Sequence, residues 1–123
     1  MEKILVVDDS DVVRYVVNEL LKEAGYDVVP ANSKLTALDE LLEEAGRFAL
    51  VLTDLNMPGG NGDDLLKVMR YEGDMTPVVL MSGENLQERR EKLLSMGFAA
   101  VVDKANTDEL ILVVKKTIEP TSD

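Results

Sequence analysis

The sequence contains no cysteine and no histidine. Without cysteine there can be no disulfide bond, zinc–thiolate site or thiol catalysis. Without histidine there can be no imidazole metal site and no catalysis by a Ser–His or Cys–His pair, and the chain cannot itself carry phosphohistidine. Any histidine that takes part in its chemistry must belong to another protein.

Basic residues are scarce as well. Thirteen lysines and arginines stand against 24 aspartates and glutamates, which gives a formal net charge of −11. Nucleic acids and anionic membranes attract clustered positive charge, so neither is an expected partner. No apolar run approaches the roughly 20 residues of a membrane span, and the first residues lack the apolar stretch of a signal peptide. We therefore expect a cytoplasmic protein.

The apolar content is sufficient for a single folded domain. The chain has 123 residues, of which 46% are hydrophobic, and one domain commonly spans about 100–150 residues. No linker or low-complexity segment divides it. We predict one domain over residues 1–119 and a C-terminal tail over 120–123.

Five short apolar runs recur along the chain. They are rich in β-branched residues and do not alternate with polar residues, which is typical of strands buried on both faces of a parallel sheet. They lie at residues 4–7, 28–29, 50–52, 78–81 and 100–102.

Segments with helical spacing follow each run, the second beginning near Ser33 and the fifth at Asn106 or Thr107, where Asn106 and Glu109 have capping-box spacing. Five strand–helix repeats predict an α/β fold in which helices cover both faces of a parallel sheet. The expected apolar stripes are Val13, Val16, Val17, Leu20, Leu21 and Ala24; Leu35, Leu38, Leu41, Leu42 and Ala45; Leu65, Leu66, Val68 and Met69; Leu86, Arg90, Leu93 and Leu94; and Leu110, Ile111, Val114 and Ile118.

Polar residues close four of the five runs. Ligands of open α/β sheets gather at the carboxyl ends of the strands, so these residues are the candidate site. They are Asp8 and Asp9, Thr53 and Asp54, Ser82 and Gly83, and Asp103 and Lys104.

Three of these side chains, Asp8, Asp9 and Asp54, would bring carboxylates together. Two unit charges about 5 Å apart repel by about 3 kcal/mol at an effective dielectric constant of 20. A hard divalent cation relieves that repulsion, and oxygen ligands with room for water suit Mg²⁺. Lys104 adds a compact positive charge that could face a phosphate. The group therefore favours a site for Mg²⁺ and a phosphoryl group.

A carboxylate can attack phosphorus and form an acyl phosphate. Asp54 is the best candidate nucleophile, because it stands alone at its strand end, before the turn-rich segment 56–62. Catalysis would then consist of positioning and charge neutralisation, which needs no histidine on this chain.

These residues, taken in order, resemble a bacterial response-regulator receiver domain of the single-domain kind found in chemotaxis and phosphorelays. The resemblance covers nearly the whole chain. It implies a flavodoxin-like fold, in which a five-stranded parallel sheet of order 2-1-3-4-5 and five helices form a three-layer sandwich. The matching pieces are Val6-Val7-Asp8-Asp9-Ser10, Thr53-Asp54-Leu55-Asn56-Met57-Pro58 with Gly62, Met81-Ser82-Gly83 and Asp103-Lys104.

The resemblance implies a metal-binding set. Asp54 matches the phosphoacceptor of the family. Asp9 matches the direct carboxylate ligand of Mg²⁺, and Asp8 matches a carboxylate that acts mainly through water. Asn56 matches the position whose backbone carbonyl completes the metal site.

The resemblance also implies the remaining roles. Ser82 matches the hydroxyl that moves onto the phosphoryl oxygen, and Lys104 matches the lysine that pairs with it. Asn56 and Glu84 match variable positions that tune the lifetime of the aspartyl phosphate. Such a chain catalyses its own phosphorylation and dephosphorylation at Asp54, although it is not a conventional enzyme.

Its expected donor is a histidine kinase or a histidine phosphotransfer protein. Its expected output surface is the fourth helix, the fifth strand and the fifth helix.

Two positions depart from the family pattern. Ala105 follows Lys104 where the family usually has proline, and Val101 stands where the family usually has an aromatic residue. An aromatic switch cannot operate with the Val101 side chain. These departures motivate one alternative, a receiver fold that binds partners without being phosphorylated.

A second alternative is a phosphatase of the haloacid-dehalogenase type. The segment Asp9-Ser10-Asp11-Val12-Val13 fits that family's D-x-D-x-[TV] pattern after an apolar strand. This hypothesis moves the nucleophile from Asp54 to Asp9. It also needs an acidic pair at a later strand end, where the chain offers only Asp108 and Glu109.

Overall fold

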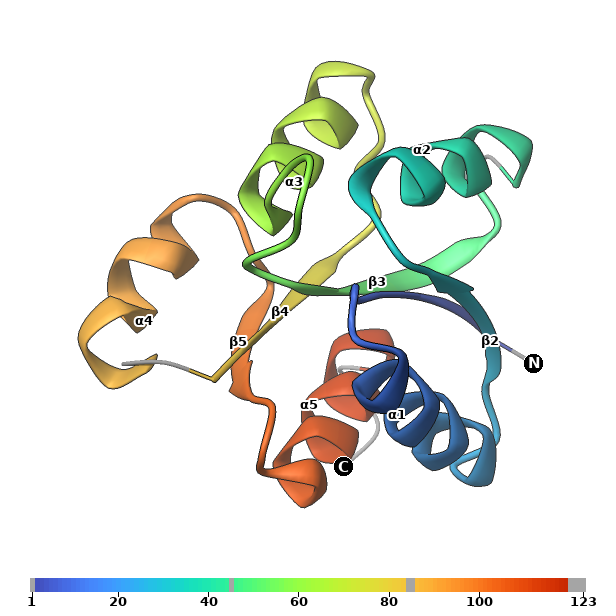
Figure 1. The fold of residues 1–123 in the computed structure, drawn as a ribbon, viewed down its shortest axis with the longest axis vertical. Helices are drawn as coiled ribbons and strands as arrows, with labels where there is room; N and C mark the ends of the chain where they lie inside the picture. Colours follow the sequence, from blue (N-terminus) through green and yellow to red (C-terminus); the bar gives the residue numbers. More distant parts are fainter. Residues whose placement is uncertain (1, 45, 84–85, 120–123) are drawn as a thin grey trace.

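A computed structural model describes residues 2–44, 46–83 and 86–119. Strands and helices alternate throughout, as the apolar pattern predicts (Figure 1). The elements are β1 (Lys3–Val7), α1 (Asp11–Glu23), β2 (Asp27–Ala31), α2 (Lys34–Glu43), β3 (Phe48–Asp54), α3 (Gly62–Tyr71), β4 (Val78–Ser82), α4 (Leu86–Ser95), β5 (Ala100–Asp103) and α5 (Thr107–Ile118).

The five strands form one parallel sheet in the order β2-β1-β3-β4-β5. The predicted fold class and strand order are therefore confirmed. Pro30 lies in β2, where it is tolerated because β2 is an edge strand.

Helices cover both faces of the sheet (Figure 1). Val17 and Leu21 of α1 and Leu110 and Val114 of α5 pack with one set of strand side chains. The other set packs with residues of α2, α3 and α4, which include Leu41, Met69 and Leu93. The result is the three-layer sandwich that the alternating pattern predicts.

Two helix starts confirm the capping signals of the sequence. The Ser33 hydroxyl accepts a hydrogen bond from the Thr36 amide at 3.1 Å, so α2 begins at Lys34. The Asn106 side chain accepts one from the Glu109 amide at 3.1 Å and donates one to the Glu109 carboxylate, so α5 begins at Thr107. These bonds satisfy amide groups that the first helical turn leaves unpaired.

Four residues of the predicted apolar stripes are exposed, so the prediction is wrong for them: Val16, Leu35, Leu42 and Leu94. α1 and α2 each contact the sheet along a narrow line, centred on Val17 and Leu21 in α1 and on Ala37 and Leu41 in α2. Val16, Leu35 and Leu42 lie beside that line and are exposed. The predictions for Ala45, Glu84, the Leu86 side chain and the tail 120–123 lie outside the described residues.

Among the residues that the structure describes, no helix combines the length and the apolar character that crossing a membrane requires.

Candidate functional site

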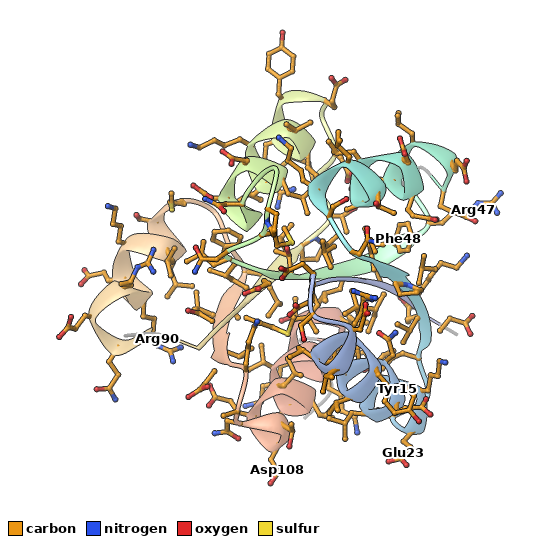
Figure 2. All side chains as sticks on the ribbon, viewed as in Figure 1. Tyr15, Glu23, Arg47, Phe48, Arg90 and Asp108 are labelled. Atoms are coloured by element: carbon orange, nitrogen blue, oxygen red, sulfur yellow. The ribbon has the colours of Figure 1, made fainter. Side chains whose placement is uncertain are left out.

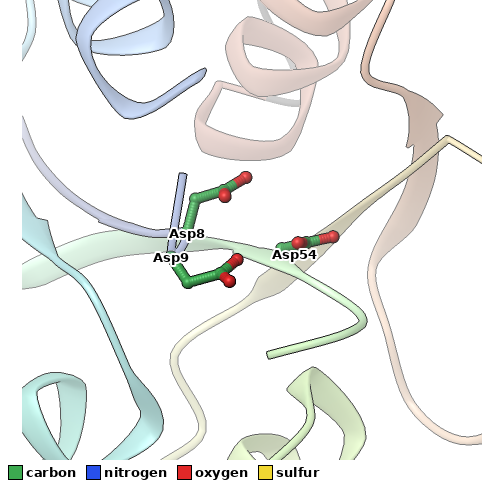
Figure 3. Close-up of side chains that lie close together, drawn as sticks. All are labelled: Asp8, Asp9 and Asp54. Carbon is green, nitrogen blue, oxygen red and sulfur yellow. The ribbon is translucent and has the colours of Figure 1, made fainter. Parts of the chain in front are cut away.

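The carboxyl ends of β1 and β3 bring three aspartates together (Figure 3). β1 ends at Val7, which pairs with Thr53, so Asp8 and Asp54 leave neighbouring strands at the same edge. The Asp8 amide donates a hydrogen bond to the Ala31 carbonyl at 3.1 Å, which holds Asp8 in line with β2. The sequence-predicted grouping of Asp8, Asp9 and Asp54 is therefore present in the fold.

One carboxylate oxygen from each of these aspartates lies within 4.8 Å of the others. Asp8 and Asp54 are buried, whereas Asp9 is exposed. The Ser10 amide donates to Asp8 Oδ1 at 2.9 Å, while Asp8 Oδ2 faces the Lys104 ammonium at 3.2 Å. Oxygen ligands of this kind, with one side open, suit a hard divalent cation.

Lys104 supplies the positive charge of the cluster. Its ammonium nitrogen lies 3.0 Å from Asp54 Oδ2 and 3.2 Å from Asp8 Oδ2. Burial alone would lower the pKa of Lys104, but the two carboxylates outweigh burial and raise it. Lys104 is therefore charged at neutral pH and holds the two buried aspartates together.

The environment of Asp54 opposes its ionisation. Burial raises the pKa of its carboxyl group, and the Asp8 carboxylate raises it further. The hydrogen bond and charge of Lys104 act in the opposite direction without cancelling the rise. Added positive charge at this edge would therefore favour the ionised, nucleophilic form of Asp54.

β4 and β5 place two further predicted residues at this edge. Ser82 ends β4, is buried, and pairs with Asp103 in the parallel register. The Lys104 amide donates to the Ser82 carbonyl at 3.1 Å, so the lysine leaves β5 beside the serine. The Asp103 carboxylate is exposed and accepts a bond from the Ala105 amide at 2.9 Å.

The loop after β3 packs tightly under Asp54. The Gly62 amide donates to the Leu55 carbonyl at 2.8 Å, which closes the loop. A Cβ atom at Gly62 would lie 2.4 Å from the Asp54 carbonyl oxygen, closer than real contacts allow. The glycine is therefore required by close approach of the backbone.

We expect Gly62→Ala to lower the free energy of unfolding by about 1–3 kcal/mol, because the extra methyl group overpacks the loop. The backbone movement needed to fit the methyl group should also displace Asp54 and slow any reaction at its carboxylate. Gly83→Ala is the matched control, since nothing lies within 4 Å of a Cβ there. Chemical denaturation of both variants measures the difference, and equal stability would contradict this reading of the loop.

The contacts of three supporting side chains were not predicted from the sequence. Arg14 Nη1 donates to the Asp8 carbonyl at 2.6 Å and also pairs with Asp11. The Lys34 side chain lies against Gly60, where a Cβ would meet its Cε at 2.7 Å. Arg90 Nη1 donates to the Val101 carbonyl at 2.9 Å and ties α4 to β5. Only Arg14 had a detectable signal, one helical turn after Asp11.

Two further residues named by the resemblance, Asn56 and Val101, lie in different surroundings. Asn56 lies two residues after Asp54 with an exposed side chain, and the role of its carbonyl stays a prediction. Val101 is buried in the core, so the position that carries an aromatic residue in the family holds a small side chain here.

Comparisons with known proteins agree with this geometry. The family model described as "Response regulator receiver domain" matches residues 4–115. Chemotaxis protein CheY-3 of Vibrio cholerae is 38% identical over 102 residues, which cover 80% of this chain and 75% of that protein. Sporulation initiation phosphotransferase F of Bacillus subtilis is 35% identical over 119 residues, which cover 94% and 92%.

Solved structures agree as well. The receiver domain of Francisella response regulator 1452 has a TM-score of 0.88 at 28% identity and covers 99% of this chain and 100% of that one. Response regulator TrrA of Thermotoga maritima, solved in complex with Mg²⁺–BeF, has a TM-score of 0.83 at 32% identity and covers 95% and 99%. The chain therefore belongs to the response regulator receiver domain family of two-component systems.

Proposed function

We propose that this receiver domain is a phosphorylation-dependent switch, which accepts a phosphoryl group on Asp54 from the histidine of a partner protein in the cytoplasm. The observation that carries the proposal is the cluster at the sheet edge. Asp54 lies within reach of two other carboxylates and 3.0 Å from the Lys104 ammonium. A histidine kinase or a histidine phosphotransfer protein is the proposed donor, because the chain itself has no histidine.

The charge balance of the site supports a magnesium requirement. Three ionised carboxylates and one ammonium leave two negative charges, which a divalent cation would balance. Asp8, Asp9 and Asp54 would hold Mg²⁺, with the Asn56 carbonyl as a further ligand. Bound Mg²⁺ would neutralise the phosphoryl oxygens and oppose the repulsion that raises the pKa of Asp54.

The chain's own groups then have defined tasks. An Asp54 carboxylate oxygen attacks phosphorus, a new O–P bond forms, and the P–N bond to the donor imidazole breaks. The leaving imidazole keeps the electron pair of that bond and takes its proton from solvent. Lys104 pairs with a phosphoryl oxygen, and the Ser82 hydroxyl donates a hydrogen bond to another. Water later attacks phosphorus and releases phosphate from Asp54.

Removal of the divalent cation is the first test. With acetyl phosphate and Mg²⁺, intact-mass spectrometry should detect one added phosphoryl group per chain. Excess chelator should abolish the addition, and restored Mg²⁺ should recover it. Equal phosphorylation with and without chelator would refute the metal requirement.

An apolar patch on α1 is suited to donor docking. Val12, Tyr15 and Val16 share one helical face, begin four residues after Asp8, and are exposed, Tyr15 by 66% (Figure 2 labels Tyr15). A donor protein that delivers a histidine to Asp54 must contact the surface around the site, which includes the start of α1. Large apolar side chains, aromatic ones above all, often dominate such interfaces.

Tyr15→Ser should slow phosphotransfer from a protein donor on the order of tenfold. Phosphorylation by acetyl phosphate should not change, because this small donor needs no docking. Tyr71→Ser is the matched control, since Tyr71 is a still more exposed tyrosine (89%) at the C-terminal end of α3. Parallel transfer assays with both donor types measure the effect. Equal slowing with acetyl phosphate would show damage to the site rather than to docking.

The output surface proposed from the resemblance is α4, β5 and α5. Ser82 pairs with Asp103 at the end of β5, and Arg90 of α4 binds the carbonyl of Val101 in the same strand. A shift of Ser82 toward a phosphoryl group could therefore reach α4 through β5 without an aromatic side chain. Figure 2 labels Arg90 on α4.

The phosphatase alternative receives no support from the geometry. It needs Asp11 beside Asp9, but the Asp11 side chain is 89% exposed and pairs with Arg14. Among the residues that the structure describes, the acidic cluster that could hold a metal consists of Asp8, Asp9 and Asp54.

A further inference from the structure

α2 and α3 enclose an apolar groove away from the phosphorylation site. The groove has a volume of about 430 Å³. The helices lie side by side on the face of the sheet that they share with α4 (Figure 1). The apolar part of the lining comes from both helices and consists of Leu38, Leu41, Leu42, Val68 and Met69.

The groove lies at the edge of the sheet opposite Asp54. Gly46, which lines it, stands two residues before β3 begins at Phe48, whereas Asp54 is the last residue of the same strand. Asp74, which also lines it, precedes β4 by four residues. A partner seated in the groove would therefore leave the carboxylate cluster accessible.

Leu42 marks the groove as a surface rather than a closed core. This leucine is 78% exposed although it borders apolar neighbours. Leu35, on the same helix, is 70% exposed but lies outside the groove. An open apolar depression of this size accepts one or two large side chains from another molecule.

The charged residues at the groove are acidic. Its described lining includes Glu72 and Asp74 and no lysine or arginine. Of the basic residues next to the groove in the sequence, Lys67 is exposed and lies outside the lining. Arg47 pairs with Glu44 at 3.6 Å, and Arg70 donates to the carbonyls of Asp74 and Thr76. A second copy of this chain, with net charge −11, would bring like charge to this rim. Charge complementarity instead favours a basic occupant.

We infer that the α2–α3 groove docks a partner protein through an amphipathic helical segment that carries large apolar side chains flanked by lysine or arginine. The apolar side chains enter between Leu42 and Val68, and the basic side chains face Glu72 and Asp74. Because the groove lies opposite Asp54, docking does not depend on phosphorylation. This surface thus holds a partner in both states of the switch.

The test uses the full chain labelled with ¹⁵N and a synthetic amphipathic peptide of leucine and lysine at physiological salt. A peptide of the same spacing with glutamate in place of lysine is the control. Chemical shifts of the groove residues should move with the lysine peptide and not with the glutamate peptide. Leu42→Ser should weaken binding on the order of tenfold, whereas Leu35→Ser should not. Glu72→Lys should weaken it and Glu88→Lys, on α4, should not.

Each outcome decides the proposal. Shifts spread evenly over the acidic surface, with equal affinity for Leu42→Ser and Leu35→Ser, would show mere charge attraction and overturn it. Groove shifts that grow with protein concentration in the absence of peptide would assign the groove to a second copy and overturn it too. Binding that is unchanged in Asp54→Asn and with beryllofluoride present supports the proposal. Because that result does not require a functional Asp54, failure of the groove and failure of the phosphorylation switch are separable.

Discussion

Asp54→Asn is expected to abolish phosphorylation by every donor, whether acetyl phosphate or a phosphorylated histidine protein. The amide has the shape of the carboxylate but cannot form an acyl phosphate. The variant should fold, because it loses a buried charge whose pKa is raised by burial and by Asp8. Intact-mass spectrometry after incubation with Mg²⁺ and acetyl phosphate measures the added group, and circular dichroism checks the fold.

The matched control for this variant is Asp63→Asn. Asp63 is an aspartate in the first turn of α3 and outside the acidic cluster. The Asp63→Asn variant should be phosphorylated on Asp54 like the native chain. If Asp54→Asn is still fully phosphorylated and phosphorylation is lost when Asp9 is replaced, the nucleophile is Asp9. That result would favour the phosphatase alternative.

Lys104→Gln is expected to slow phosphorylation by about 100- to 1,000-fold, the usual effect of removing one electrostatic group from an active site. The lysine ammonium contacts both Asp54 and Asp8, and it would face the phosphoryl oxygens during transfer. Its hydrogen bond and charge lower the pKa of Asp54. Their loss should therefore raise that pKa further and reduce the ionised fraction at a given pH.

Two measurements separate these effects of Lys104→Gln. Rates of phosphorylation by acetyl phosphate give the kinetic loss, and NMR titration of the Asp54 carboxyl carbon in metal-free protein gives the pKa. Lys115→Gln, which removes a lysine from the last turn of α5, should change neither quantity. A native rate together with an unshifted pKa in Lys104→Gln would contradict the role given to this lysine.

The strands and helix starts were predictable where apolar runs or capping residues mark them in the sequence. Residues 4–7 of β1 and 78–81 of β4 are continuous apolar runs. The caps at Ser33 and Asn106 are hydrogen bonds between residues three apart in the sequence. The buried faces of the helices were less predictable. α2 has leucines on several sides, and only contact with the sheet selects Leu41 for burial and leaves Leu42 exposed.

The grouping of the candidate site was predictable for a topological reason. Parallel strands end at one edge, so Asp8, Asp54 and Ser82 had to meet once the strands were identified. The contacts around them depend on side-chain conformations and loop paths. The reach of Arg14 to the Asp8 carbonyl and of Arg90 to the Val101 carbonyl could not follow from spacing alone.

The most direct measurement is borohydride trapping of the phosphorylated chain followed by peptide mapping. Borohydride reduces an aspartyl phosphate to homoserine, so it records which aspartate carried the group. After incubation with Mg²⁺ and acetyl phosphate, the proposed mechanism predicts homoserine at position 54 alone. Homoserine at position 9, or phosphate incorporation without any homoserine, would contradict it.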